Sequence, residues 1–421
     1  DISTDSRSIK KDSFFIAIKG KNFDGNDYVE EAFKKGAVLA LVDDAKFADT
    51  KNNRIIYVKN TLQALAKISK NIIKNYNGKV IAITGSNGKT TTTSIIASTL
   101  SDSSSTIGNF NNEIGLPLSI FNSSPKSKYL VYEIGASKFN DINYLSDILK
   151  PDIGVITNIG LSHLESLKNI QGVLKVKSEI INNIKKNGFL IVPDDDKDHL
   201  QHWKNIRSDI KLLTFGLKES SDFHPLEPSL KTNGLYFLVK SIYLEKIIKI
   251  NSKLEGNHNI LNILASCAVH YCLSQDINEF AKKIKSLIFK NSRLTKIKWI
   301  KNSILIDDTY NANPDSARKS IDLLSNHDNK TYLILGDMLE LGIHQEKYHK
   351  EIGQYAKLKG IDVFLGFGNL AKHAVDGFGN NGIFFDTEDE LKNYLKQNIS
   401  KKDVILIKGS RGMRMERFIN V

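Results

Sequence analysis

The first 77 residues alternate short apolar runs with polar turns. Runs of strand length occupy residues 14–18, 38–42 and 54–58, and a helical pattern covers residues 26–35. Strands that alternate with helices are typical of α/β units. We therefore predict a small α/β domain over residues 1–77.

A longer α/β pattern begins after the polar segment 75–78. Residues 79–84 form an uninterrupted apolar run, which is typical of a parallel strand covered by helices on both faces. The pattern predicts a doubly wound, mostly parallel sheet over residues 78–291. Further strand-like runs lie at 129–132, 153–156 and 189–192, and helical segments at 178–184 and 254–287.

A third alternation covers residues 292–421 and predicts a Rossmann-like α/β domain. At roughly 150 residues per domain, three domains agree with a chain of 421 residues. The strand-like runs lie at 303–306, 331–335, 363–366 and 404–407, and the helical segments at 314–324 and 346–358.

The composition predicts a folded protein without a membrane span. Apolar residues make up 41% of the chain, and no run approaches the roughly 18 apolar residues needed to cross a bilayer. Cys267 and Cys272 lie five positions apart in a helical segment, so they cannot form a disulfide with each other. We expect a soluble, cytoplasmic, monomeric protein.

The chain is basic, with a formal net charge of +12. Only eight of its 59 basic residues are arginines, and the lysines are scattered along the sequence. No basic arm or aromatic ladder of the kind that binds nucleic acid is visible. We therefore expect small anionic substrates rather than a nucleic-acid partner.

The strongest chemical signal lies at residues 84–91, between an apolar strand and a helix. Its glycines allow backbone N–H groups to converge on a phosphate, while Lys89 reaches the β- and γ-phosphates and Thr90 ligates Mg²⁺. The segment departs from G-x-x-x-x-G-K-[ST] at Ile83, and the alternative is an ordinary strand-to-helix turn. The residues expected at ATP are Thr84, Gly85, Ser86, Asn87, Gly88, Lys89, Thr90 and Thr91.

Three further polar residues follow the neighbouring strand-like runs. Glu133 and His163 are expected at the carboxyl edge of the sheet, where doubly wound folds bind ligands. Glu133 is a candidate Mg²⁺ ligand, with a solvated rim residue as the alternative, and a lone histidine is usually structural. By itself, Lys177 has the pattern of a surface lysine.

These motifs resemble those of the Mur ligase family, ATP-dependent enzymes that form amide bonds in peptidoglycan synthesis. The resemblance includes residues 84–91, 133–136 and 157–160, and it extends from Asp5 to Arg417. Within the family, the chain is most similar to members that add D-alanyl-D-alanine to UDP-N-acetylmuramoyl-tripeptide. That narrower similarity rests on the motifs at 108–117, 307–314, 335–342 and 408–414.

The resemblance implies a ligase that uses ATP and Mg²⁺ and proceeds through an acyl phosphate, which the amine of the dipeptide attacks. It also implies that residues 1–77 bind the UDP-sugar, residues 78–291 bind ATP and residues 292–421 bind the dipeptide. A Mur ligase that adds a different amino acid is the nearest alternative.

The resemblance assigns roles to individual residues. Thr90 and Glu133 correspond to ligands of a first Mg²⁺, and His163 to a ligand of a second. Lys177 corresponds to a carbamylated lysine, whose adduct with CO₂ is an anion that helps to hold the metal. The remaining expectations are Asn259, Arg293 and Asp308 at the nucleotide, Ser6, Arg7, Asn111 and Asn112 at the UDP-muramoyl substrate, and Asp337, Glu340 and Arg411 at the dipeptide.

One pattern favours a different class of protein. Gly366, Gly368 and Ala371 match G-x-G-x-x-A, and Asp386 follows about 20 residues later, as in a dinucleotide-dependent dehydrogenase. That fingerprint normally occupies the first βα turn of its domain, whereas two βα units precede it here. A non-catalytic nucleotide switch is a further alternative, which would not consume ATP in response to both substrates.

Overall fold

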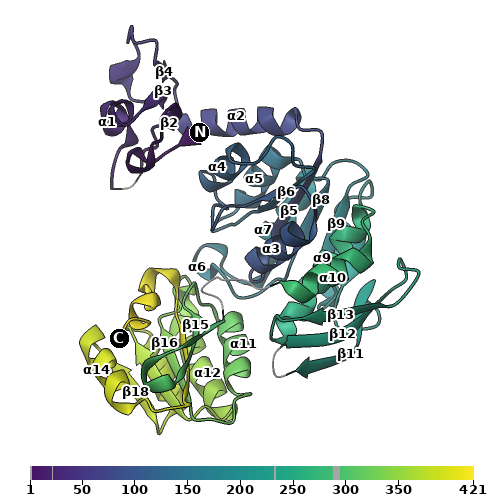
Figure 1. The fold of residues 1–421 in the computed structure, drawn as a ribbon, viewed down its shortest axis with the longest axis vertical. Coiled ribbons are helices and arrows are strands. Elements are labelled where there is room, and N and C mark those ends of the chain that lie inside the picture. The colour runs from purple at the N-terminus through teal and green to yellow at the C-terminus, as the bar shows by residue number, and fades with distance from the viewer. Residues whose placement is uncertain (1, 21, 232–233, 288–293) are drawn as a thin grey trace.

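The computed structural model describes residues 2–20, 22–231, 234–287 and 294–421. Within them, the chain forms three β-sheets of four, nine and six strands, one after another along the sequence. Figure 1 shows the three corresponding bodies, with the first at the top and the third at the bottom. The predicted three-domain α/β fold is confirmed. Its boundary at 77/78 stays a prediction, and the boundary at 291/292 lies outside the described residues.

The first sheet is small and fully parallel, with the order β1-β2-β3-β4. Its core contains Phe15, Ala40 and Val42. The predicted helix at 26–35 begins as the 3-10 helix η2 and continues as α1. The elements are β1 (Ile2–Ser3), η1 (Ser6–Ser8), β2 (Ser13–Ile16), η2 (Gly25–Tyr28), α1 (Val29–Lys34), β3 (Ala37–Val42), η3 (Ala45–Phe47) and β4 (Ile55–Tyr57).

Helix α2 (Thr61–Lys74) connects the first sheet to the central body. The Asn60 side chain caps its N-terminus. Its buried residues are divided between two cores, because Leu65 packs with the first sheet whereas Ala66 and Ile73 pack in the central body. The helix therefore attaches the first body to the second (Figure 1).

The central sheet has the order β13-β12-β11-β10-β9-β8-β5-β7-β6. All neighbouring pairs are parallel except those that β12 makes with β11 and β13. The mostly parallel sheet is confirmed, but its antiparallel edge was not predicted. The strands are β5 (Lys79–Thr84), β6 (Ser103–Ser105), β7 (Tyr129–Glu133), β8 (Ile153–Ile156), β9 (Phe189–Pro193), β10 (Lys211–Phe215), β11 (Phe223–Lys231), β12 (Gly234–Ser241) and β13 (Ile248–Ser252).

Helices cover both faces of this sheet, which explains the apolar run of β5. One core includes Ile83 and Ile263, and the core on the other face includes Ala82 and Leu145. The segment predicted as a helix at 178–184 is instead a 3-10 helix that follows α7. The helices are α3 (Lys89–Thr99), α4 (Gly115–Phe121), α5 (Asp141–Leu149), α6 (Leu164–Leu167), α7 (Ile170–Ser178), η4 (Glu179–Asn183), α8 (Lys197–Lys204), α9 (Asn257–Cys272) and α10 (Ile277–Ser286).

The third sheet has the order β14-β15-β19-β16-β17-β18 and is parallel except at β14. Two cores, on its two faces, include Leu333 and Ile334 respectively. The elements are β14 (Thr295–Lys298), η5 (Ile300–Asn302), β15 (Ile304–Asp308), α11 (Pro314–Leu324), β16 (Thr331–Gly336), η6 (Gly342–His344), α12 (Gln345–Leu358), β17 (Val363–Phe367), α13 (Ala371–Phe378), β18 (Gly382–Phe385), α14 (Glu388–Asn398), β19 (Val404–Lys408), η7 (Arg411–Met413) and η8 (Met415–Phe418).

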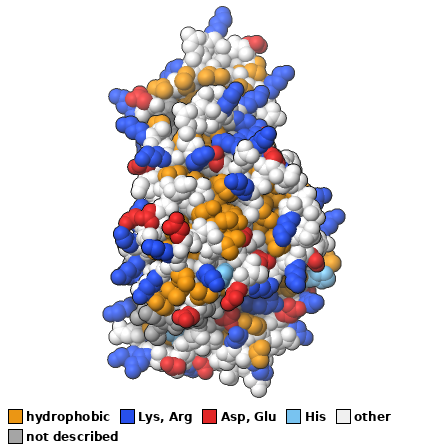
Figure 2. Space-filling view, turned by 90° about the vertical axis from the view of Figure 1, so that its right-hand side faces the viewer, with side chains coloured by type: hydrophobic (Ala, Val, Ile, Leu, Met, Phe, Trp, Pro, Cys, Tyr) orange, Lys and Arg blue, Asp and Glu red, His pale blue; other side chains and the backbone are white. Residues whose placement is uncertain are grey.

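The surface carries its basic residues in a dispersed pattern. Figure 2 shows lysine and arginine side chains over the whole height of one face, interspersed with acidic and apolar side chains. Across the described segments, we find no helix that combines the length and the apolar character needed to span a membrane.

Candidate active site

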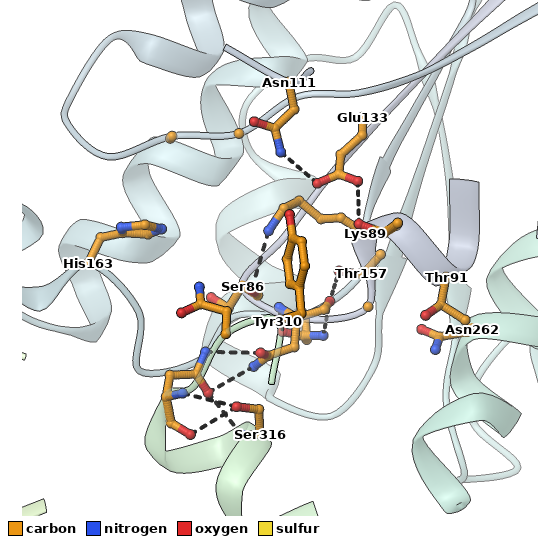
Figure 3. Close-up of a pocket in the computed structure, with 18 of the residues that line it drawn as sticks. Ser86, Lys89, Thr91, Asn111, Glu133, Thr157, His163, Asn262, Tyr310 and Ser316 are labelled. Atoms are coloured by element: carbon orange, nitrogen blue, oxygen red, sulfur yellow. Dashed lines mark hydrogen bonds between the residues drawn. The ribbon is translucent and has the colours of Figure 1, made fainter. Parts of the chain in front are cut away.

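A cavity of about 1340 Å³ is lined by residues of both the central and the third bodies. The central body contributes residues at the carboxyl ends of β5, β7 and β8, and the third body contributes residues that follow β15. Open α/β sheets bind ligands at this edge. Figure 3 shows that side chains from both bodies converge there.

The loop between β5 and α3 has the geometry of a phosphate-binding loop. Gly85 and Gly88 have φ angles of 142° and 81°, which favour glycine. Helix α3 begins at Lys89, so the N–H groups of its first turn lie at the cavity. The Lys89 Nζ donates to the carbonyl of Gly85 at 2.8 Å. Residues 86–91 line the cavity, whereas Thr84 and Gly85 are buried beneath it.

Residues that follow β8 brace this loop, a role that the sequence did not reveal. The Thr157 hydroxyl and the Asn158 Nδ2 both donate to the Asn87 carbonyl, at 2.6 and 2.8 Å. The Gly160 N–H donates to the Ser86 hydroxyl at 2.9 Å. Hydrogen bonds from residues outside the loop thus hold its conformation.

Thr90, Glu133 and Asn111 form one hydrogen-bonded group. Figure 3 shows Glu133 and Asn111 beside Lys89. The Thr90 hydroxyl and the Asn111 Nδ2 donate to the two Glu133 carboxylate oxygens, at 2.6 and 2.7 Å. Glu133 is only 2% exposed, so it is not a solvated rim residue. Its carboxylate and the Thr90 hydroxyl offer the oxygen ligands that Mg²⁺ prefers.

The donor set at Glu133 fits a cation that is shared with a nucleotide. Among the residues that the structure describes, no group of three or more His, Cys, Asp or Glu side chains is placed to hold a metal ion. Mg²⁺ typically takes one or two carboxylates from the protein and the remaining oxygens from phosphates and water. Glu133 and Thr90 match that pattern, and the metal itself stays a prediction.

Lys177 lies inside the central body, at the end of α7, and is 1% exposed. It is therefore not a surface lysine. Burial lowers the pKa of its amine to about 7, and the positive charge of Lys89 shifts the pKa in the same direction. The carboxylates of Asp141, Glu133 and Glu179 oppose this shift. Because a neutral amine reacts with CO₂, the environment is compatible with the predicted carbamate.

A close contact between the side chains of His163 and Glu340 joins the central body to the third. The His163 Nδ1 lies 2.5 Å from the Glu340 Oε2, and this contact lowers the pKa of the Glu340 carboxyl. The Glu340 carbonyl also accepts from the Glu165 N–H at 3.1 Å. Two residues with separate predicted roles, one at the metal and one at the dipeptide, are thus direct neighbours.

Two of the three residues predicted at the nucleotide line the cavity. Asn259 does so near the start of α9, and its Nδ2 donates to the Glu255 carbonyl at 2.7 Å. Asp308 is buried and accepts from the ammonium of Lys408 at 2.5 Å. Arg293 lies outside the described residues.

The residues predicted at the UDP-muramoyl substrate are not brought together. Asn111 and Asn112 line the cavity, and the Asn112 Oδ1 accepts from the Gly115 N–H at 2.8 Å. Ser6 and Arg7 lie in the first body and do not line this cavity. The Arg7 guanidinium pairs with the neighbouring Asp5 at 2.8 Å.

Asp337 occupies the position that a dinucleotide phosphate would need. Its Oδ1 accepts from the N–H groups of Leu370 and Ala371 at 2.9 and 2.8 Å, at the N-terminus of α13. It is buried and does not line the cavity, so the structure does not place it at the predicted dipeptide site. A phosphate cannot take these N–H groups while the carboxylate holds them, which argues against the dehydrogenase alternative.

We expect Asp337→Ala to lower the free energy of unfolding by about 2–4 kcal/mol, because it leaves two N–H groups without their charged acceptor. Asp386→Ala is the control: Asp386 is exposed, and its loss is expected to cost less than about 0.5 kcal/mol. Urea unfolding of both variants measures the difference. Equal losses in the two variants would contradict the capping role.

Helix α11 of the third body begins against the phosphate loop. Asn313 caps this helix, and its Nδ2 donates to the Asn87 Oδ1 at 2.9 Å. Asp315, in the first turn, accepts from the Leu161 N–H at 2.8 Å. The capping pattern of Asn313 is visible in the sequence. Its contact with Asn87 is not, because the two residues are 226 positions apart.

The fold and the site define a phosphate-loop nucleotide-binding protein whose site is shared by two α/β bodies. Three family descriptions match the chain in succession: "Mur ligase family, catalytic domain" over residues 1–72, "Mur ligase middle domain" over 83–270, and "Mur ligase, glutamate ligase domain" over 292–411. The chain belongs to the Mur ligase family.

Full-length relatives support this assignment. The UDP-N-acetylmuramoyl-tripeptide--D-alanyl-D-alanine ligase of Bacillus subtilis is 35% identical over 99% of this chain and 92% of its own length. The protein of the same name from Escherichia coli is 30% identical, with the same coverage.

Solved structures show the same architecture. MurF from Acinetobacter baumannii has a TM-score of 0.89 at 28% identity and covers 99% of this chain and 92% of its own. MurF ligase from Thermotoga maritima, in complex with ADP, has a TM-score of 0.87 at 29% identity, with coverage of 99% and 95%.

Proposed function

We infer that this chain is an ATP-dependent ligase that adds D-alanyl-D-alanine to UDP-N-acetylmuramoyl-tripeptide in the synthesis of peptidoglycan precursors. One observation carries the inference: the cavity has a phosphate loop on one side and the third body on the other. Such a site can hold ATP next to a second reactant. The name shared by the 35% and 30% identical relatives supplies the substrates. We propose that the reaction takes place in the cytoplasm.

The chemistry requires activation, because a carboxylate is a poor electrophile. Transfer of the γ-phosphoryl group to the tripeptide carboxylate gives an acyl phosphate, and the dipeptide amine then attacks and releases phosphate. Lys89 neutralises charge on the transferring group, and Glu133 with Thr90 would hold Mg²⁺, which offsets the charge of the phosphates when bound. No covalent enzyme intermediate is required.

We assign one substrate to each body. The first binds the UDP-sugar, the central one binds ATP, and the third presents the dipeptide. The assignment of ATP is supported by the loop at residues 84–91 and by the T. maritima relative, whose structure contains ADP. The contacts of Asn313 and Glu340 with the central body support the third body's place beside ATP.

Phosphate release from ATP tests the function. The assay contains ATP, Mg²⁺, D-alanyl-D-alanine and UDP-muramoyl tripeptides whose third residue is either meso-diaminopimelate or L-lysine. We expect release only when a tripeptide and the dipeptide are both present, and the preferred tripeptide identifies the specificity. Release that ignores the substrates would support a nucleotide switch, and turnover with a single amino acid would support a different Mur ligase.

The predicted role of Arg411, binding of the dipeptide, can be tested by steady-state kinetics. Its side chain is 61% exposed outside the cavity and pairs with Glu416 at 3.1 Å. If its planar guanidinium binds the dipeptide carboxylate, Arg411→Lys is expected to raise the KM for the dipeptide about tenfold and to leave the KM for ATP nearly unchanged. Arg414→Lys, also exposed, is the control. Equal changes in both KM values would remove the assignment.

A further inference from the structure

The segment 337–342 of the third body contacts the central body through Glu340. Hydrogen bonds within the third body hold this segment in place. The Asp337 carbonyl accepts from the Ser410 N–H at 3.0 Å, and the Leu339 N–H donates to the Ser410 hydroxyl at 2.8 Å. Glu340 has a φ of 63°, a conformation that a residue with a side chain rarely adopts. From there its carboxylate reaches His163.

His349 holds the centre of this segment. Its Nε2 accepts from the Met338 N–H at 2.9 Å, and its Nδ1 lies 2.7 Å from the Gln345 carbonyl. An Nε2 that accepts carries no proton, so the ring is neutral and its Nδ1–H donates to the Gln345 carbonyl. His349 is 0% exposed, and neither nitrogen is left to bind a ligand.

The position of the bond matters, because Met338 lies two residues before Glu340. A loss of the bond at Met338 would leave a buried N–H group without a partner, which costs more than the hydrogen bond itself gains. The segment could recover that cost only by moving toward water. Glu340 would move with it, away from His163 and Glu165, which lie on the segment that follows the phosphate-loop brace at 157–160.

We propose that His349 is a positioning residue for ligation: by accepting the Met338 N–H, it keeps segment 337–342 in the conformation in which Glu340 binds the central body. The effect of His349 on ligation rests on the proposed function, whereas its hydrogen bond with Met338 does not depend on that function. His349 touches no reactant and acts through Glu340.

Two substitutions separate this role from simple core packing. In His349→Gln, the amide oxygen reaches about as far as Nε2 and can still accept from Met338. In His349→Asn, the shorter amide reaches only as far as Nδ1 and can keep only the bond to Gln345. Both substitutions place a polar amide in the same buried position. Thermal unfolding of each variant measures how much stability the substitution costs.

We expect His349→Gln to keep its kcat within about threefold of the wild type and His349→Asn to lose about tenfold or more, beyond any loss of folded protein. The affinity for ADP is expected to stay unchanged in both variants, because the phosphate loop has its own brace. Glu340→Gln is expected to lower kcat as His349→Asn does, and the double variant should add little, since both act on one contact.

Hydrogen exchange supplies a readout that does not depend on ligation. The Met338 N–H is expected to be protected in the wild type and in His349→Gln, and to exchange faster in His349→Asn. Equal exchange in all three proteins, or equal kcat in the two variants, would overturn the proposal. A wild type that does not ligate but shows the exchange difference would refute the proposed function and leave the contact with Met338 established.

Discussion

Replacement of Lys89 by alanine is expected to lower the ligation rate by about 10²–10³-fold, or about 3–4 kcal/mol of transition-state stabilisation. The reason is electrostatic. The γ-phosphoryl group carries negative charge to an anionic carboxylate, and Lys89 would supply the ammonium group of the loop that we propose to bind the phosphates. In the structure it bonds to the Gly85 and Ser86 carbonyls, so it already lies over the loop.

The fold is expected to survive this substitution. Lys89 is only partly buried, and the loop keeps the hydrogen bonds from Thr157 and Asn158 to Asn87. The thermal midpoint should therefore change little, and the exposed Lys67→Ala should match the wild type in both stability and rate. More than about a tenth of wild-type activity in Lys89→Ala would show that the residue does not serve the phosphoryl transfer.

Replacement of Lys177 by alanine is expected to leave almost no activity, although the residue does not line the cavity. A buried ammonium without a carbamate would be a costly charge in the core, and its removal would then be tolerated or even stabilising. With the carbamate, the same side chain ends in a carboxylate near Glu133. Its removal would then take a negative group away from the metal site.

Chemical rescue distinguishes the two states of Lys177. Acetate or propionate is expected to restore part of the activity of Lys177→Ala, because a short-chain acid can replace the lost carboxylate. Lys175→Ala is the matched control: Lys175 lies two positions earlier in α7 but is exposed, and its loss is expected to change little. A fully active Lys177→Ala enzyme, or density for an unmodified amine beside bound Mg²⁺, would contradict the carbamate.

The pKa of Lys177 sets the sign of the pH dependence. Carbamylation consumes the neutral amine and releases a proton, so it becomes more favourable as pH rises through the pKa of about 7. At a fixed concentration of dissolved CO₂, enzyme freed of CO₂ should regain activity faster at about pH 8 than at about pH 6, whereas an exposed lysine near pKa 10.4 would stay almost wholly charged at both. Activity before and after equilibration with CO₂ gas at a fixed pressure measures this difference.

Local sequence patterns predicted most of the fold. The sequence placed β5 and the strands at 129–132 and 153–156 within one residue of their observed bounds, and it placed the phosphate loop directly after β5. It could do so because periodicity and glycine preference are properties of short segments. The antiparallel edge, β12 and β13, was missed. Strand β13 alternates buried and exposed residues over only five positions, which is a weaker signal than a continuous apolar run.

The candidate site was predicted less evenly, and for most of its residues only through the resemblance. The sequence by itself indicated the phosphate loop and a possible carboxylate ligand at Glu133. It could not show that Lys177 is buried, that Glu340 binds His163, or that Asp337 caps α13 instead of facing a ligand. These are statements about which side chain fills which space.

The physical reason is the range of the interactions. The sequence by itself determined most of the helices and strands and the glycine-dependent turn at 84–91, since the spacing of apolar side chains and the preference of glycine for such turns are properties of short segments. Only the tertiary structure decided the burial of Lys177 and the contact between Asn87 and Asn313, which joins residues 226 positions apart. Burial lowers the pKa of Lys177, and proximity allows Asn313 to bond with Asn87. Both effects require the folded and packed chain.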